Sequence, residues 1–244
     1  MPLETLLLLT AGVFVIAVLY SSVGHAGASG YIAVMSLLSL APVIIKPTAL
    51  ALNILVASIA TWQFFKAGHF SWRLFWPFAI LAVPFAFLGG YINLPTHTFK
   101  VILGFVLLYS AASLLFTAQR DKQVSEPPRL PAIGVGAGIG LLSGLTGTGG
   151  GIFLTPLLLF MGWAEAKSAA AVSALFILVN SVAGLMGYLS NANTLPSLIA
   201  PLFVAAALGG VVGSYLGSRR FESAVIKRFL AVVLFIAGAK LIFM

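Results

Sequence analysis

The stretch Gly24-His25-Ala26-Gly27-Ala28-Ser29-Gly30 interrupts a run of sequence, residues 5–45, that contains no Asp, Glu, Lys or Arg. A single helix over that run would be roughly 60 Å long at 1.5 Å per residue, twice the ~30 Å hydrocarbon core of a bilayer. The run must therefore break, and the glycines mark the position of the break. We predict one helix over about 5–23 and a second over about 28–41.

A second uncharged run, residues 130–164, is broken in the same way at Thr146-Gly147-Thr148-Gly149-Gly150-Gly151. The two halves of the chain align by eye, because placing Ser22 on Ser143 also brings Lys46 onto Lys167. The sequence therefore predicts an internal repeat of about 110–120 residues. The alternative is a chance alignment of glycine-rich apolar sequence.

The composition decides the class of protein. Of the 244 residues, 61% are hydrophobic and only 7% are charged, against roughly 25% charged residues in a soluble domain. These proportions exclude a soluble enzyme. They also argue against a nucleic-acid partner, because the 13 Lys and Arg are scattered between apolar runs and form no patch. We expect an integral membrane protein with no catalytic residue, no metal and no cofactor. Cysteine is absent, so thiol chemistry is excluded.

The predicted fold class is an all-α polytopic membrane protein with two inverted repeats of about five hydrophobic segments each. The first pair of segments in each repeat is broken or re-entrant at its glycine-rich motif. The remaining segments are expected at about 47–65, 74–92, 100–116, 168–189, 196–216 and 228–244. We assign residues 1–118 to the first repeat, 119–131 to a linker and 132–244 to the second repeat.

The basic residues predict the orientation in the membrane. If ten of the 13 lie on one face and Lys46, Lys100 and Lys240 on the other, the richer face is cytoplasmic. The linker then lies in the cytoplasm and both termini lie on the non-cytoplasmic side. Lys46 and Lys167 fall at equivalent turns on opposite sides. We expect both to snorkel towards water, and the alternative is that they attract anions to each mouth.

The two breaks, which we expect to face each other, predict a binding site near the middle of the membrane. Broken backbone in a bilayer is tolerated where protein or a water-filled cavity satisfies it, and a helix N-terminus favours an anion. We therefore expect a small anionic substrate. Close helix packing by small residues is the alternative interpretation. The candidate substrate-binding residues are Ser22, His25, Gly27, Ser29, Gly30, Thr146, Thr148, Gly149, Gly150 and Gly151, with Tyr31, Asn53 and Asn180 as secondary candidates.

The five carboxylates support an anion over a cation. They fall at segment ends or in the linker, whereas cation and proton transporters usually place an acidic residue inside a span. His25 is the one ionisable residue inside a break, where it either contacts the anion or pairs with a carbonyl freed by the break. Asn53 and Asn180 lie inside later segments, where a structural role is the first interpretation and contact with a ligand the second.

The second break resembles the glycine-rich motif of the TauE/SafE family of sulfite and organosulfonate exporters. Residues 147–157 are close to the family pattern G-x-G-G-G-x-x-x-x-P-x. Residues 20–31 are similar to a variant of the pattern, in which alanine and serine replace two of the glycines. Four residues further on, Met35 stands at the position of the proline. The resemblance implies a secondary transporter that exports a small sulfur oxyanion across the bacterial inner membrane.

Two other functions remain open at this point. A passive anion channel would use the same donors as a transporter. The stretch Gly27-Ala28-Ser29-Gly30 also resembles the GxSG motif of rhomboid intramembrane proteases, whose serine acts with a histidine base. Ser29 occupies the repeat position of Gly150, which gives this motif another explanation. The sequence leaves open the anion, the direction of transport, the coupling ion and the oligomeric state.

Overall fold

Helices make up all the regular secondary structure in the part of the chain that the computed structural model describes, namely residues 3–22, 25–116, 124–191, 194–196, 199–219 and 224–243. The predicted all-α class is therefore confirmed, and the helix ends agree with the predicted segments to within about one turn. In chain order the helices are α1 (Leu3–Ser22), α2 (Ala28–Leu37), α3 (Pro42–Lys66), α4 (Trp72–Tyr91), α5 (Thr96–Phe116), α6 (Arg129–Thr146), α7 (Gly151–Phe160), α8 (Ala166–Ser190), α9 (Ile199–Arg219) and α10 (Ala224–Phe243).

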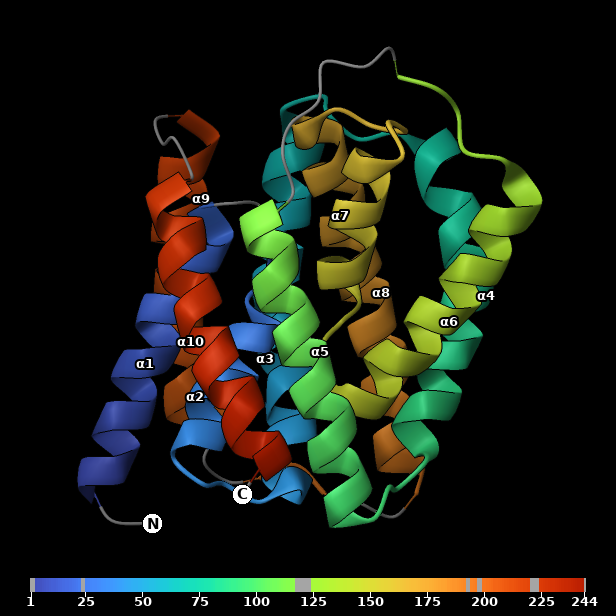
Figure 1. The fold of residues 1–244 in the computed structure, drawn as a ribbon. Coiled ribbons are helices and arrows are strands. Elements are labelled where there is room, and N and C mark those ends of the chain that lie inside the picture. The colour runs from blue at the N-terminus through green and yellow to red at the C-terminus, as the bar shows by residue number, and fades with distance from the viewer. Residues whose placement is uncertain are drawn as a thin grey trace.

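Two of the helices are half-length, and each follows a glycine-rich break. Helices α2 and α7 have 10 residues each, which corresponds to only about 15 Å of rise. Both begin inside the bundle and run to opposite faces of it (Figure 1). Each half of the chain thus pairs a long first helix with a short return helix. This is the broken arrangement that the length of the uncharged runs predicts.

In the described residues, six helices are long and apolar enough to cross a bilayer: α1, α3, α4, α5, α6 and α8. Helices α3 and α8 are the longest, with 25 residues each, and they are also the most enclosed by protein. They pack against each other, and α4 packs on α8 while α9 packs on α3. Residues of α3 and α8 are therefore the ones best placed to meet a ligand inside the bundle.

Glycine allows the closest helix pair, α4 and α6, to pack backbone to backbone. Gly136, Gly140 and Gly144 recur every four residues on one side of α6. A Cβ atom added at these positions would collide with the carbonyl oxygens of Phe78, Ala82 and Ala86 of α4, respectively. Such contacts between small residues are the usual means of helix association in membranes. The glycines of α6 therefore serve helix packing, and the glycines of the breaks have different surroundings.

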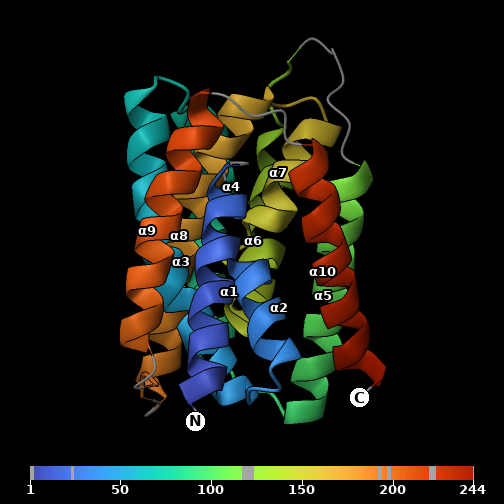
Figure 2. The ribbon, with the colours of Figure 1, turned by 90° about the vertical axis from the view of Figure 1, so that its left-hand side faces the viewer.

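Figures 1 and 2 show the direction of the helices. Helices α1 and α5 begin on the face that carries both chain ends, whereas α6 and α10 begin on the opposite face. Corresponding helices thus run in opposite directions, as an inverted repeat requires, and α4 packs on α6 while α9 packs on α1. Basic residues lie at helix ends on the second face, among them Lys66, Arg129 and Lys167. An exact symmetry between the halves, and the side on which the cytoplasm lies, stay predictions.

Candidate functional site

The second break, residues 147–150, turns the chain through backbone conformations that only glycine adopts readily. Gly147, Gly149 and Gly150 have φ angles of 84°, 75° and 83°. The first helical bonds of α7 are donated by Phe153 and Leu154, both to the carbonyl of Gly150 at 3.1 Å. The N–H groups of Gly151 and Ile152 precede these bonds, at the positive end of the helix dipole. The break therefore presents backbone donors inside the bundle.

Polar side chains from α3 and α8 lie directly against this break. A Cβ atom added to Gly149 would stand 2.7 Å from the Nδ2 atom of Asn53 and 3.0 Å from the Oγ atom of Ser181. Asn53 donates from Nδ2 to this oxygen at 3.4 Å, and both side chains are fully buried. Only glycine leaves room for this approach. Asn53 thus contacts the break that the sequence analysis identified, although it was placed only among the secondary candidates.

Several buried polar groups on α3, α6 and α8, the helices that form or contact the second break, have no hydrogen-bond partner within the described residues. They are Asn53 Oδ1, Ser143 Oγ, Thr48 Oγ1 and both amide atoms of Asn180. Asn180 directly precedes Ser181 on α8. Ser143 lies one turn before the break, and its carbonyl accepts a hydrogen bond of 2.8 Å from the N–H of Gly147. Buried polar groups in proteins nearly always have partners, because an unsatisfied one costs about 1–3 kcal/mol. The free Oδ1 atom of Asn53, the one of these groups that is seen to approach Gly149, therefore indicates a place where a polar ligand or water belongs.

The threonines of the second break are already bonded. Thr146 donates to the carbonyl of Leu142 at 2.6 Å, and its hydroxyl oxygen lies 3.0 Å from that of Thr148. On the other side of the break, Gly150 faces Phe176, because an added Cβ would stand 2.9 Å from that ring. The surroundings of the break are consequently polar at Asn53 of α3 and Ser181 of α8, and apolar at Phe176 of α8.

The first break is described from residue 25 onward, and two tyrosines pack against its glycines. Gly27 has a φ of 97°, and an added Cβ would stand 2.8 Å from the ring of Tyr31. The hydroxyls of Tyr20 and Ser29 share a hydrogen bond of 2.8 Å, and Gly30 packs against Ile16 and Tyr20. Tyr31 OH is buried without a partner among the described residues. The two breaks are thus unequal, since the first is packed by aromatic rings.

The structure does not gather all the candidate residues into one shell. Thr146, Thr148, Gly149, Gly150 and Gly151 lie together and contact α3 and α8. Gly27, Ser29 and Gly30 lie together among Ile16, Tyr20 and Tyr31. The backbone N–H of His25 donates to the carbonyl of Tyr20 at 2.9 Å, and the side chain of Ser22 lies outside the described residues. That the two breaks face each other stays a prediction.

Two residues of these clusters, Tyr20 and Ser181, were not among the predicted candidates. Tyr20 precedes the first break in sequence, and its pairing with Ser29 depends on how α2 folds back on α1. Ser181 directly follows the candidate Asn180, and this adjacency was the sequence feature that could have suggested Ser181 as a further candidate. The expectation that Lys46 snorkels is wrong. Its side chain is 5% exposed, because three carbonyls at the end of α4 accept bonds from its Nζ atom.

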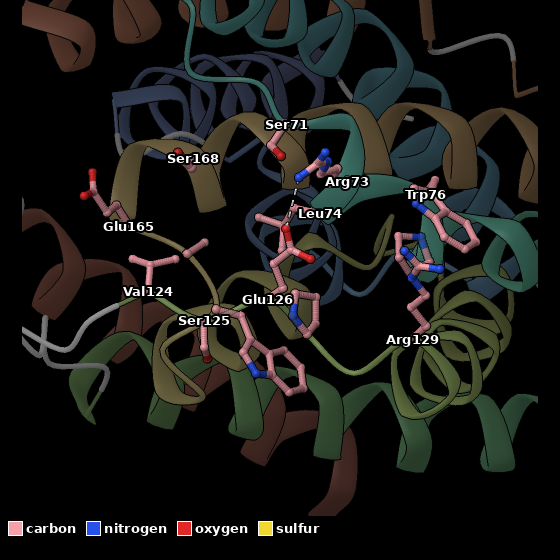
Figure 3. Close-up of a pocket in the computed structure, with 14 residues that line it drawn as sticks. Ser71, Arg73, Leu74, Trp76, Val124, Ser125, Glu126, Arg129, Glu165 and Ser168 are labelled. Atoms are coloured by element: carbon pink, nitrogen blue, oxygen red, sulfur yellow. Dashed lines mark hydrogen bonds and ion pairs between the residues drawn. The ribbon is translucent and has the colours of Figure 1, made fainter.

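A cavity of about 650 Å³ lies at the end of the bundle where α4 and α8 begin, next to residues 124–129 (Figure 3). Its charges are balanced, with Arg73 paired to Glu126 at 3.4 Å on exposed side chains. Arg129 lies over the ring of Trp76, with its guanidinium carbon 5.9 Å from the ring centroid. Trp163 lines this cavity and belongs to the same apolar cluster as Phe176, which covers Gly150. Apolar side chains therefore separate the cavity from the second break.

Comparison with known proteins agrees with these observations. Residues 8–241 match the family model described as "Sulfite exporter TauE/SafE". A probable membrane transporter protein of Sinorhizobium fredii, y4hK, is 44% identical over 234 residues, which is 94% of this chain and 95% of the relative. A probable membrane transporter protein of Methanocaldococcus jannaschii, MJ0441, is 28% identical over 151 residues, which is 60% of this chain and 56% of the relative. No solved structure matches the chain.

Proposed function

The chain belongs to the TauE/SafE sulfite exporter family, and we propose that it is a secondary transporter that exports a small sulfur oxyanion, sulfite or an organosulfonate, across the bacterial inner membrane. The family and the relatives support the coarser statement, that of a multi-pass membrane transporter. The identity of the substrate and the residues that bind it are our proposal.

The observation that carries the proposal is the contact between Asn53 and Gly149. A buried amide donor thus lies against Gly149, two residues before the start of α7, and the Asn180 amide on α8, which also lacks a partner among the described residues, is the further donor that we assign to the site. All these groups are neutral, so they can offer hydrogen bonds to an anion without a competing carboxylate. The described carboxylates lie in the first turn of α1, in the segment before α6 and at the N-cap of α8.

We assign the main binding role to the second break, with Asn53, Asn180, Ser181, Thr146 and Thr148 around the backbone of Gly149, Gly150 and Gly151. The residues of the first break, namely Ser22, His25, Gly27, Ser29 and Gly30, complete the site from the other half of the chain. This division follows the surroundings of the two breaks, because the first is occupied by Tyr20 and Tyr31.

Transport then requires the site to open to each face in turn. Inverted repeats of broken helices achieve this by rocking one repeat against the other. With the linker face in the cytoplasm, the apolar cluster of Phe78, Trp163 and Phe176 closes the site on that side. An anion that leaves a negative-inside cell gains about 2.3 kcal/mol per charge per 100 mV. Export therefore needs no coupling cation, in agreement with spans that contain no Asp or Glu at their centres.

The test is counterflow of radioactive sulfite in proteoliposomes. Wild-type protein should accumulate labelled sulfite against unlabelled internal sulfite, with a rate that saturates. Asn53→Leu removes the amide at similar volume and should reduce the initial rate strongly. Ser110→Ala is the matched control, because Ser110 is also a buried polar residue of a span but bonds only within its own helix, to Val106 O at 2.6 Å.

Three results would contradict the proposal. A wild-type protein that carries sulfite no faster than empty liposomes would refute the substrate. Equal rates in wild type and Asn53→Leu would refute the site. Unitary currents in a planar bilayer, without saturable counterflow, would show the passive anion channel instead.

A further inference from the structure

A second cavity, of about 330 Å³, opens on the face of the bundle that carries both chain ends. It lies where α3 begins and where α4 and α8 end. Its walls include Lys46 of α3, Asn93 and Thr96 between α4 and α5, Leu145 of α6 and Tyr188 of α8. We call it the lysine cavity. Among the described residues it is lined by one basic residue and no acidic one, whereas the cavity of Figure 3 is lined by residues of both signs.

Lys46 brings a buried positive charge to this cavity. Its Nζ atom donates to the carbonyls of Gly89, Gly90 and Ile92 at 3.0, 2.9 and 3.1 Å. It also lies 5.7 Å from the centroid of the Tyr188 ring. Among the described residues the ion pair of Arg73 with Glu126 is the one salt bridge, so no carboxylate neutralises Lys46. Only dipoles and a ring offset its charge, and the positive potential extends into the low-dielectric cavity.

The lysine cavity adjoins the second break. A Cβ atom on Gly147 would stand 3.0 Å from the carbonyl oxygen of Lys46, and Leu145 lines the cavity two residues before that glycine. Helix α3 then leads from Lys46 to Asn53 beside Gly149, and on the way it passes Thr48, whose hydroxyl has no partner among the described residues. Seven residues of helix span about 10 Å. One helix therefore links the cavity to the proposed binding site.

We propose that the lysine cavity is a second anion site, the vestibule through which the oxyanion leaves the second break. Lys46 supplies the attraction, and the side chains of Asn93, Thr96 and Tyr188 add polar groups to a lining that is otherwise apolar. The counterpart Lys167 is exposed, so it does not form the equivalent of the buried Lys46 on the opposite face. The proposal rests on the proposed function for its direction of use, but the anion site itself is independent of it.

The first test measures protection of Lys46 in wild-type protein. An amine-reactive acetylating reagent is applied with and without sulfite or sulfate, and the rate at each lysine is followed by mass spectrometry. At an anion concentration of ten times Kd, acetylation of Lys46 should slow about tenfold. Lys240 is the internal control on the same face. It also donates to three oxygens, those of Ser36, Leu37 and Ser39, but does not line the cavity. Acetylation of Lys46 at the same rate with and without anion would overturn the proposal.

The second test decides the case in which Lys46 is never acetylated. Lys46→Met should raise the KM for sulfite entering from the chain-end face about tenfold or more, with a smaller effect at high salt. The KM from the linker face should stay unchanged, Lys46→Arg should restore the wild-type value, and Lys167→Met is the matched control. A lysine that merely caps α4 would instead lower the rate from both faces alike, and that result would overturn the vestibule.

The two proposals can fail separately. Protection of Lys46 by sulfate in a protein that transports no sulfur oxyanion would refute the proposed function and leave the anion site standing. Protection of Lys46 should also persist in Asn53→Leu. Its loss in that variant would show that the signal came from the second break, and the separate vestibule would be refuted.

Discussion

Gly149→Ala is the substitution for which the structure gives the sharpest expectation. Gly149 has a φ of 75°, and an alanine in the left-handed region costs roughly 1–2 kcal/mol of folding free energy. The added methyl group would also stand 2.7 Å from Asn53 Nδ2 and 2.8 Å from Ile177 Cγ2. Such distances force the neighbours to move. The amide of Asn53 would therefore leave its place beside the first N–H groups of α7.

Gly68→Ala separates the two effects. Gly68 has nearly the same φ, 76°, but lies in the loop between α3 and α4, with nothing within 4 Å of an added Cβ. In both variants the strained backbone should lower the free energy of unfolding by roughly 1–2 kcal/mol. Only Gly149→Ala should lose more stability than this, and only Gly149→Ala should lose the response to sulfite.

The assay is thermal unfolding of the purified protein with and without sulfite. A ligand at 100 times its Kd stabilises the native state by about 2.7 kcal/mol. Wild type and Gly68→Ala should keep that ligand-dependent increase in the melting temperature, and Gly149→Ala should lose it. If the two variants were equally stable and responded equally to sulfite, the reasoning about the second break would be refuted.

Three further predictions concern the surrounding structure. Gly140→Ala would drive a methyl group into the carbonyl of Ala82, so α4 and α6 must separate and the free energy of unfolding should fall by about 1–3 kcal/mol. Gly138→Ala is the control in the same melting experiment, because its methyl group meets nothing within 4 Å and should not destabilise the protein. Tyr20→Phe and Ser29→Ala each remove the same hydrogen bond and should each cost about 1 kcal/mol, and a double variant that loses the sum of the two would contradict the pairing. Glu126→Gln breaks the exposed ion pair with Arg73 and should leave the melting temperature and the sulfite transport rate unchanged, while a clear loss of transport would show that the cavity of Figure 3 takes part.

Much of the fold followed from length and charge. A run without charges from residue 5 to residue 45 cannot form one helix in a bilayer, so the glycines had to end it. The same arithmetic placed the second break at residues 146–151. The positions of both breaks could be predicted because they depend only on the length of the uncharged run and on the glycines within it.

The partners of the breaks could not be obtained in that way. Asn53 and Gly149 lie in different halves of the chain, 96 residues apart, and their contact depends on how α3 crosses the second break. Serine is common at packed helix surfaces in membranes, so Ser181 gave no distinctive signal. Lys46 was expected to snorkel because a lysine near a helix end usually reaches water. The end of α4, which offers three carbonyls, changes that outcome.

The most direct measurement of the central claim is equilibrium binding of radioactive sulfite to purified wild-type protein and to Asn53→Leu. The account predicts saturable binding to wild type that unlabelled sulfite displaces and that chloride at the same concentration does not. It predicts that Asn53→Leu, folded by its melting curve, binds at least about tenfold more weakly, because a charge-assisted hydrogen bond contributes about 1.5–3 kcal/mol. Equal affinity in the two proteins would contradict the account.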